Sequence, residues 1–288
     1  MAESRGARII CFGDVIDDIV AIPRGPIRDD TDTPSTIRSA AGGSAANTAA
    51  WLGALGAAVD LVATVGAGDA ARHAGLLPGV AAHLAERPDL ATGAIVVIVE
   101  GERRHMLTER GANAALDPSQ VTDALLAEAG VLHLTGHTLL NAAGITGLIE
   151  RARAAAVEVS VSPGSSGFIA DYGVEKFARA ISGATIVFAS LEEGRLLTGA
   201  TEPGDVAARL PFEHVVLTLG TNGVIVSREG EQFAVPAVRA EVVDPTGAGD
   251  AFCAGYLHEW VRTRDARAAA EAGTRVAARA VAALGARP

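Results

Sequence analysis

The sequence predicts an α/β fold in which a mostly parallel sheet lies between two layers of helices. Short apolar runs, typical of buried strands, alternate along the 288 residues with stretches rich in alanine and leucine, typical of helices. This alternation favours parallel strands joined by helices that cover both faces of the sheet. A glycine-rich segment near the C-terminus leads directly into a helix-forming run, which adds an anion-binding turn to this fold.

The expected strands cover residues 8–12, 59–65, 130–135, 158–162, 184–188, 214–219 and 223–227. The expected helices cover residues 45–55, 142–156, 192–197, 251–261 and 265–284. Two stretches depart from the alternation. Residues 15–38 are polar and contain proline, whereas residues 93–108 predict a β-hairpin that turns near Gly101. No repeat or linker marks a second unit, so we expect one domain over residues 1–288.

Composition and charge exclude several classes of protein. A net charge of −10 and a pI near 5.2 argue against a nucleic-acid surface, which normally needs a basic stripe. No apolar run approaches the length of a membrane span, and residues 1–8 are polar and short, so we expect a cytoplasmic protein without membrane contact. Cys11 and Cys253 sit in apolar segments and are expected to be buried, reduced thiols.

The segment DPTGAGDAF at residues 244–252 predicts a phosphoryl-transfer site. Gly247 and Gly249 lack a Cβ, so the backbone can take positive φ and come close to a ligand. With Ala248, they should open a helix whose amide groups and dipole favour an anion. A carboxylate beside an anion site repels the anion, so its presence there indicates a chemical role. Asp250 is therefore the candidate general base that takes a proton from an attacking hydroxyl.

Two alternative roles fit this segment less well. A dinucleotide fingerprint would need glycine where Phe252 stands, and few residues follow for its βαβ unit. Asp250 as a plain helix N-cap is the purely structural alternative. A partial echo, VGAGDA at residues 65–70, shows how common such turns are, and Asp69 there is expected to cap a helix.

Phosphate binding must rely on groups other than lysine. The chain contains one lysine, Lys176, and no G-x-x-x-x-G-K-[ST] segment, which excludes a Walker P-loop and a protein-kinase lysine. Backbone amides, Mg²⁺ and arginines are then the expected sources of positive field. Asp14, Asp17 and Asp18 cluster after the first strand, where carboxylates could orient the hydroxyls of a polyhydroxylated acceptor. We expect Asp14 and Asp18 to serve there and Asp17 to be solvated.

These segments together resemble the ribokinase (PfkB) family of carbohydrate and nucleoside kinases. Residues 244–252 match the family's C-terminal signature, and AGGSAANTA at residues 41–49 resembles its N-terminal signature. The resemblance implies a ribokinase-like three-layer αβα sandwich. It also implies a small β lid over the sugar, formed by residues 15–38 and 93–108, with ATP and Mg²⁺ as cofactors.

The resemblance also implies roles for individual residues. Beside Asp250 and its anion loop, the acceptor site is expected to use Asp14, Asp18, Gly42, Gly43, Asn47 and Arg110, although a solvated Arg110 fits the sequence equally. The nucleotide side is expected to use Glu193, Thr218, Gly220, Gly223 and Thr246. Glu193 is implied to hold Mg²⁺ through water, and Asp244 to join a monovalent-cation site for K⁺.

This chain departs from the family pattern at several places. Ile16 and Ser44 stand where ribokinase has an asparagine and a lysine on ribose, so the resemblance does not name ribose as the acceptor. Ser190 replaces the asparagine of the family's N-x-x-E motif, while Glu193 keeps the acid. On the nucleotide side, Ser162 replaces an aspartate and Thr274 replaces an asparagine near the adenine.

The leading prediction is a kinase that phosphorylates a hydroxyl of a small sugar or sugar acid. A nucleoside kinase is the alternative, but the two lid segments contain no aromatic residue for stacking a base. A phosphosugar kinase would need extra cations, for which Arg103, Arg104 and Arg110 are candidates. A non-catalytic sugar-binding regulator is disfavoured because Asp250 is present. Exposed lid strands often pair between subunits, which predicts a homodimer through the lid.

Overall fold

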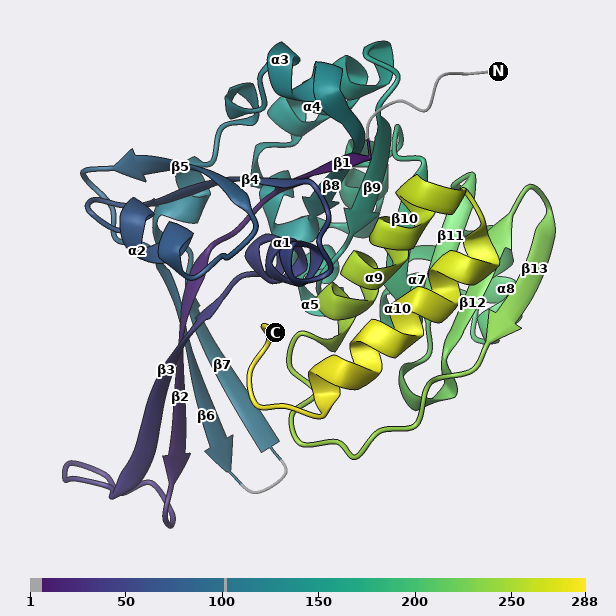
Figure 1. Cartoon of the computed structure of the whole chain (residues 1–288). Coiled ribbons are helices and arrows are strands. Elements are labelled where there is room, and N and C mark those ends of the chain that lie inside the picture. Colours follow the sequence, from purple (N-terminus) through teal and green to yellow (C-terminus); the bar gives the residue numbers. More distant parts are fainter. Residues whose placement is uncertain (1–6, 101–102) are drawn as a thin grey trace.

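The central sheet has nine strands, in the order β13-β12-β11-β10-β9-β8-β1-β4-β5 (Figure 1). The computed structural model describes residues 7–100 and 103–288. Pairing is parallel from β5 to β11, whereas β12 pairs antiparallel with β11 and with the edge strand β13. The strands are β1 (Arg8–Phe12), β4 (Val59–Gly66), β5 (Ala81–Arg87), β8 (Ala129–Thr135), β9 (Glu158–Ser162), β10 (Ile186–Ser190), β11 (His214–Thr218), β12 (Val224–Arg228) and β13 (Glu231–Val235). The prediction of a mostly parallel sheet is confirmed.

Alternate side chains of each central strand enter two separate hydrophobic cores. In β1, Ile9 and Cys11 belong to one core, whereas Ile10 and Phe12 belong to the other. The first core is covered by α1 (Ser44–Ala54), α9 (Ala248–Thr263) and α10 (Ala266–Val281). The helices of the second core are α3 (Asp123–Glu128), α4 (Ala142–Ala154), α5 (Ser166–Tyr172), α6 (Val174–Ala180), α7 (Leu191–Thr198) and α8 (Pro203–Arg209). This arrangement gives the predicted three layers.

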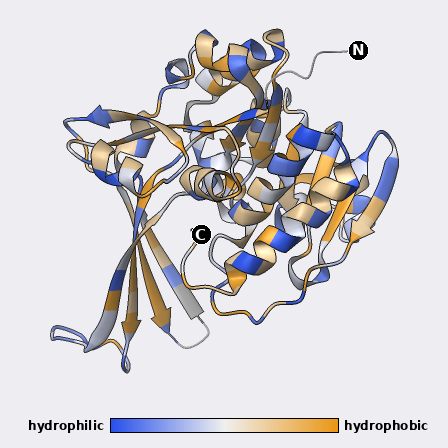
Figure 2. Cartoon of the chain, viewed as in Figure 1, coloured by the Kyte–Doolittle hydropathy of each residue, from blue (hydrophilic) through white to orange (hydrophobic). Residues whose placement is uncertain are grey.

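A smaller sheet projects from the body and forms the lid (Figure 1). Its four strands follow the order β3-β2-β6-β7 and comprise β2 (Ile16–Pro23), β3 (Ser35–Gly42), β6 (Gly93–Glu100) and β7 (Arg103–Glu109). β6 and β7 pair as the predicted hairpin, whose turn at Gly101 lies outside the described residues. The first lid segment reaches Gly42, beyond the expected limit at residue 38. Figure 2 shows hydrophobic residues along β2 and β6, in contrast to the hydrophilic outer turns of α10.

The helices α3, α5, α6 and α8 and the strand β13 were not expected. The remaining elements are short, and the sequence indicated only α2 among them, as the helix after Asp69. They are α2 (Ala70–Gly75), η1 (Gly111–Ala115), η2 (Pro118–Gln120), η3 (Gly136–Asn141) and η4 (Gly220–Asn222). Strand β5 was also missed, because its sequence AAHLAER mixes charged and small residues in place of an apolar run. Cys11 and Cys253 are buried free thiols, as predicted. Across the described residues, every helix is too short or too polar to cross a membrane.

Candidate active site

The predicted anion loop opens helix α9. Gly247 is the N-cap residue in the left-handed conformation, with φ 75°, and the helix begins at Ala248. A Cβ added to Gly249 would meet no protein atom within 4 Å, so this side of the loop is open to a ligand. The first backbone N–H groups of a helix have no partner within that helix. The loop therefore has the geometry of the anion site that its sequence predicts.

Asp250 lies in the first turn of α9, and α1 holds its carboxylate. The Ser44 hydroxyl donates to Oδ1 at 2.5 Å, and the Asn47 amide donates to Oδ2 at 3.0 Å. Burial raises the pKa of Asp250 to about 7, although the bonds from Ser44 and Asn47 oppose this shift. A carboxylate with this pKa can accept a proton near neutral pH, as a general base must.

Two of the predicted acceptor-side carboxylates face the start of α1. Asp14 is buried, and its Oδ1 accepts hydrogen bonds from the Ala45 amide at 3.2 Å and the Thr135 hydroxyl at 3.4 Å. Asp18 packs against Gly42, where any Cβ would collide with its carboxylate. Burial raises the pKa of Asp18 to about 6, and the positive charge of Arg287 opposes the rise. Gly43 fits the same corner, because its Cβ would lie 2.5 Å from the Asp14 carbonyl oxygen.

Arg287 joins this group, and sequence reasoning did not find it. Its Nε donates to Asn47 Oδ1 at 3.1 Å, and its Nη2 donates to the Gly42 carbonyl at 2.8 Å. The guanidinium faces four carboxylates, those of Asp14, Asp17, Asp18 and Asp250. These contacts join residues about 240 positions apart, and no local pattern around Arg287 signals them.

Glu193 and Ser190 form a capping box at the start of α7. The Ser190 hydroxyl accepts the Glu193 N–H at 3.2 Å, and Glu193 Oε2 accepts the Ser190 N–H at 2.7 Å. Burial raises the pKa of Glu193. Ser190, which replaces the family asparagine, therefore fixes the acid by a local motif. The S-x-x-E spacing was sufficient to predict this cap from the sequence.

Two cavities meet at the anion loop. One, of about 490 Å³, is lined by Ser44, Glu193 and residues 247–250. The other, of about 560 Å³, is lined by Thr218, Gly220, Gly223 and apolar residues of α9 and α10, with Thr274 among them. Thr218, Pro245, Ala248 and Gly249 line both cavities. Four of the predicted nucleotide-side residues, Glu193, Thr218, Gly220 and Gly223, therefore line a space that runs from a polar end at Asp250 to an apolar end beside α10, whereas Thr246 lines neither cavity.

Asp244 organises the approach to the loop. Its Oδ1 accepts the Thr246 N–H at 2.9 Å and the Thr246 hydroxyl at 2.6 Å. Its Oδ2 accepts the Gly285 N–H at 3.2 Å. Both oxygens of the expected cation ligand thus make protein contacts that fix the loop against the C-terminal residues.

Arg110 stands at the end of the lid hairpin. It is the N-cap residue of η1, and its carbonyl accepts the Asn113 side chain at 3.1 Å. Asn113 also bonds the backbone of Val15, which fixes the start of β2. Arg110 and Asp14 both face His137, whose pKa is lowered by burial. The side chains of Arg103 and Arg104, the other predicted cations, lie outside the described residues.

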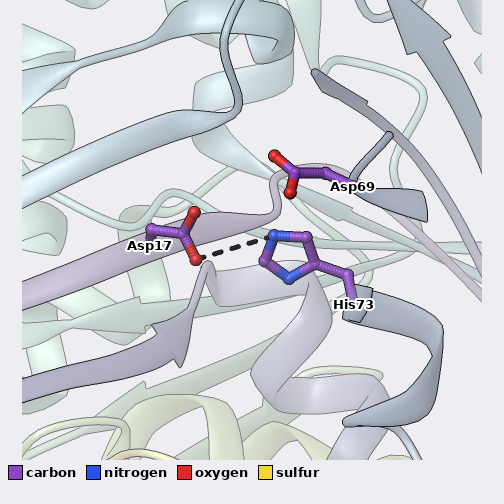
Figure 3. A group of neighbouring side chains, drawn as sticks. All are labelled: Asp17, Asp69 and His73. Carbon is purple, nitrogen blue, oxygen red and sulfur yellow. Dashed lines mark ion pairs between the residues drawn. The ribbon is translucent and has the colours of Figure 1, made fainter. Parts of the chain in front are cut away.

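Asp17 departs from the prediction made for it, and Asp69 does so in part. Arg72 bonds both oxygens of Asp17 at 2.8 Å and also contacts Asp69 at 2.9 Å, and His73 Nε2 lies 3.6 Å from Asp17 (Figure 3). Asp17 is thus ion-paired, not solvated, because α2 packs beside β2. Asp69 is the N-cap residue of α2, as predicted, but its side chain makes no capping bond and accepts instead from Arg72 and from the Thr92 hydroxyl. This network fastens the lid to the body.

His133 and His137 do not act together. His133 is buried and bonds the Ser160 hydroxyl through Nδ1 at 2.9 Å, and burial lowers its pKa to about 4. His137 lies beyond the end of β8 and packs edge-on against Phe168. The two rings therefore have different partners.

Comparison with known proteins agrees with this geometry. The family model described as pfkB family carbohydrate kinase matches residues 7–288. An ATP-dependent ribose-1-phosphate kinase from Halopiger xanaduensis is 30% identical over 273 residues, covering 92% of this chain and 88% of the relative. A probable sugar kinase from Rhizobium etli has a TM-score of 0.85 at 25% identity, covering 99% of this chain and 96% of that chain. An Arabidopsis thaliana ribokinase solved with ribose and ATP shares the fold, with a TM-score of 0.84 at 22% identity, covering 98% and 94%.

Proposed function

Because the chain belongs to the pfkB family of carbohydrate kinases, and is thus a sugar or nucleoside kinase, we propose that it transfers the γ-phosphate of ATP to a hydroxyl of a small sugar or sugar acid. One observation carries this proposal. Asp250 stands in the first turn of α9, directly beside the backbone of residues 247–249, which is open to a ligand at Gly249. A base and an anion site at this spacing suit in-line attack of a hydroxyl on a phosphoryl group.

In the proposed reaction Asp250 takes the proton of the acceptor hydroxyl. The freed oxygen forms a bond to the γ-phosphorus, and the bond from that phosphorus to the oxygen of the β-phosphate breaks, so that ADP leaves. The amides of Gly247, Ala248 and Gly249 stabilise negative charge on the transferring group. Ser44 and Asn47 keep the carboxylate of Asp250 oriented towards the acceptor side.

The two joined cavities suit ATP. The apolar cavity beside Phe252 and Val281 fits a purine base, and the polar cavity fits phosphates that reach the α9 amides. Thr218, Gly220, Gly223 and Thr246 are assigned to the nucleotide. Glu193 lines the polar cavity and is held by Ser190, so it suits a water-mediated Mg²⁺ ligand. Mg²⁺ would neutralise phosphate charge when bound.

The acceptor is assigned to the space between the lid and α1. Asp14 and Asp18 offer carboxylate oxygens there, and Gly42 and Gly43 allow close approach. Arg110 is assigned to the same space, because its charge and that of Asp14 both act on His137. A phosphosugar acceptor is the second candidate, because Arg287 adds a cation beside Asp18, and the Halopiger xanaduensis relative is a ribose-1-phosphate kinase. The nucleoside alternative is less favoured, because the two lid segments contain no aromatic residue that could stack on a base.

Four further expectations remain predictions. They are activation by K⁺ near Asp244, a homodimer formed through the lid, a cytoplasmic location, and a single kinase domain that spans residues 1–288 with its lid. The contacts of Asp244 with Thr246 and Gly285 support a fixed loop at the cation position. The exposed apolar side chains of the lid support the dimer.

The test is an ATP-consumption assay with Mg²⁺, with and without K⁺, over sugars, sugar acids, phosphosugars and nucleosides. Asp250→Asn is the blank in each assay. Turnover of a sugar or sugar acid that the blank lacks supports the proposal. Preference for a phosphosugar or a nucleoside would transfer the assignment to that class. No turnover of any acceptor above the blank would contradict the kinase assignment.

A further inference from the structure

Arg287 is held firmly beside the catalytic helix by the residues that precede it. The Gly285 N–H donates to Asp244, and the Ala286 carbonyl accepts the Trp51 indole N–H at 2.9 Å. Ala286 itself is buried against Gly247. The position of the Arg287 guanidinium is therefore determined by the anion loop and by α1, the two elements that also determine the position of Asp250.

The bond from Arg287 to Asn47 fixes which way the Asn47 amide points. An asparagine side chain has an oxygen that accepts and a nitrogen that donates, and the two ends can exchange by rotation. A guanidinium has only donors, so it requires the oxygen end of Asn47 to face it. The Arg287 Nε contact at 3.1 Å thus turns the nitrogen end towards Asp250, where it donates to Oδ2 at 3.0 Å.

Arg287 also supplies positive charge where negative charge accumulates. The titratable groups whose charges act on Asp250 or are acted on by it are Asp14, Asp18, Cys11, Cys253 and Arg287. Arg287 is the cation among them. Its attraction to Asp18, Asp17, Asp14 and Asp250 opposes the lowering of its own pKa by burial. The same attraction favours the ionised carboxylates.

We propose that Arg287 is a positioning residue for phosphoryl transfer: it orients the Asn47 amide so that its nitrogen donates to the carboxylate of Asp250. This inference rests on the proposed function, because it assigns Asp250 the role of base. Arg287 does not touch the reacting atoms. It acts through Asn47, so its loss should change the pH at which the base becomes active more than it changes ATP binding.

The test is the pH profile of kcat/KM for the best acceptor, measured for the full chain and for Arg287→Met, which keeps most of the stem volume without the charge. We expect the midpoint of the profile to move up by about one pH unit, because a freed Asn47 no longer holds its donor end on the ionised carboxylate of Asp250. Turnover at pH 7 should fall about fivefold and largely recover at high pH. The Kd for ATP should stay within about twofold.

Two further variants separate positioning from folding. Arg287→Lys keeps the charge but lacks the planar fork, so its midpoint should lie between those of the wild type and Arg287→Met. Arg279 stacks over Trp51 at 5.6 Å and serves as the matched control, since Arg279→Met should leave the midpoint unchanged. In the double variant with Asn47→Leu and Arg287→Met, the loss of kcat/KM, expressed as free energy, should be smaller than the sum of the two single losses. Both substitutions act on the same hydrogen bond, the one from Asn47 to Asp250.

A midpoint unchanged in Arg287→Met, in a wild-type enzyme that is active, would overturn the inference. Equal shifts of the midpoint in Arg287→Met and Arg279→Met would also overturn it, since the loss of any nearby positive charge would then explain the shift. By contrast, a wild type that phosphorylates no acceptor would contradict the proposed function itself.

Discussion

Gly247 and Ala286 lie so close that a Cβ on Gly247 would approach the Ala286 Cβ to 2.6 Å. The glycine at the start of α9 therefore does more than take a positive φ. It lets the C-terminal residues lie directly under the anion loop, and these residues carry Arg287 to Asn47. The loop, α1 and the C-terminal residues are one interlocked unit around Asp250.

Gly247→Ala and Gly249→Ala should therefore impair turnover by different routes. The first substitution strains a left-handed residue and forces Ala286 away, so we expect a lower melting temperature together with lost turnover. The second meets no protein atom, so the fold should keep its stability while the new methyl group crowds the phosphate. Thermal unfolding and the KM for ATP, measured on both variants, check this. Equal loss of melting temperature in both would contradict it.

The pH dependence of turnover should follow the ionisation of Asp250. The base must be deprotonated, and its pKa is raised to about 7. As pH falls through about 7, the carboxylate gains a proton and kcat/KM should drop tenfold per unit. As pH rises above that value, kcat/KM should reach a plateau. A profile from pH 5 to pH 9 measures this, and activity that stays flat down to pH 5 would exclude Asp250 as the titrating base.

Ser190→Ala should destabilise the protein by about 1 kcal/mol, the usual effect of removing a helix N-cap. The variant loses the bond to the Glu193 N–H and loosens the acid that lines the phosphate cavity. Urea unfolding gives the stability change. In a Mg²⁺ titration of turnover, the Mg²⁺ concentration at half-maximal turnover should be higher than in the wild type, because the ion binds less tightly. Thr122→Ala, which removes the N-cap of α3 away from both cavities, is the control: it should lose similar stability without moving the Mg²⁺ midpoint.

The lid should mediate dimer formation. Ile37 is 66% exposed and Leu107 is 60% exposed, and the register of the four-stranded sheet puts both on the same face. Light scattering at micromolar concentration should give the mass of a dimer for the wild type. Ile37→Lys with Leu107→Lys should give a monomer, because two charges would enter an apolar interface. A wild-type monomer would contradict the prediction.

The sequence predicted the features that depend on neighbouring residues. The parallel sheet, the lid hairpin and the helix that follows Gly247 all arise from short patterns of apolar residues and glycines, and they are confirmed. It missed β5, whose charged residues suit its place at the sheet edge. It placed Asp69 at the start of a helix, but the side chain there bonds Arg72 and Thr92 in place of the helix backbone.

Contacts between distant segments were beyond prediction from the sequence alone. Asn47 and Asp250 were each assigned to the site, but the bond between them, over 203 positions, depends on how α1 packs against α9. No local sequence pattern marks Arg287 as a site residue. Its place in the site becomes visible only in the structure, where the C-terminal residues pack against Gly247 and bring Arg287 to Gly42. Likewise, the pairing of Asp17 with Arg72 depends on the position of the lid relative to α2.

The most direct measurement of the central claim compares Asp250→Asn with the wild type. We expect turnover to fall by at least about 10³-fold, within the range for loss of a general base, with an ATP Kd that changes little. The unfolded chain releases this proton near the ordinary pKa of an aspartate and the folded chain near 7, so folding stability falls as pH rises between these values and stays at the lower level at pH 8. The variant should therefore unfold at a temperature no lower than the wild type at pH 8. Turnover close to the wild-type value in a folded, ATP-binding variant would contradict the assignment of Asp250 as the base.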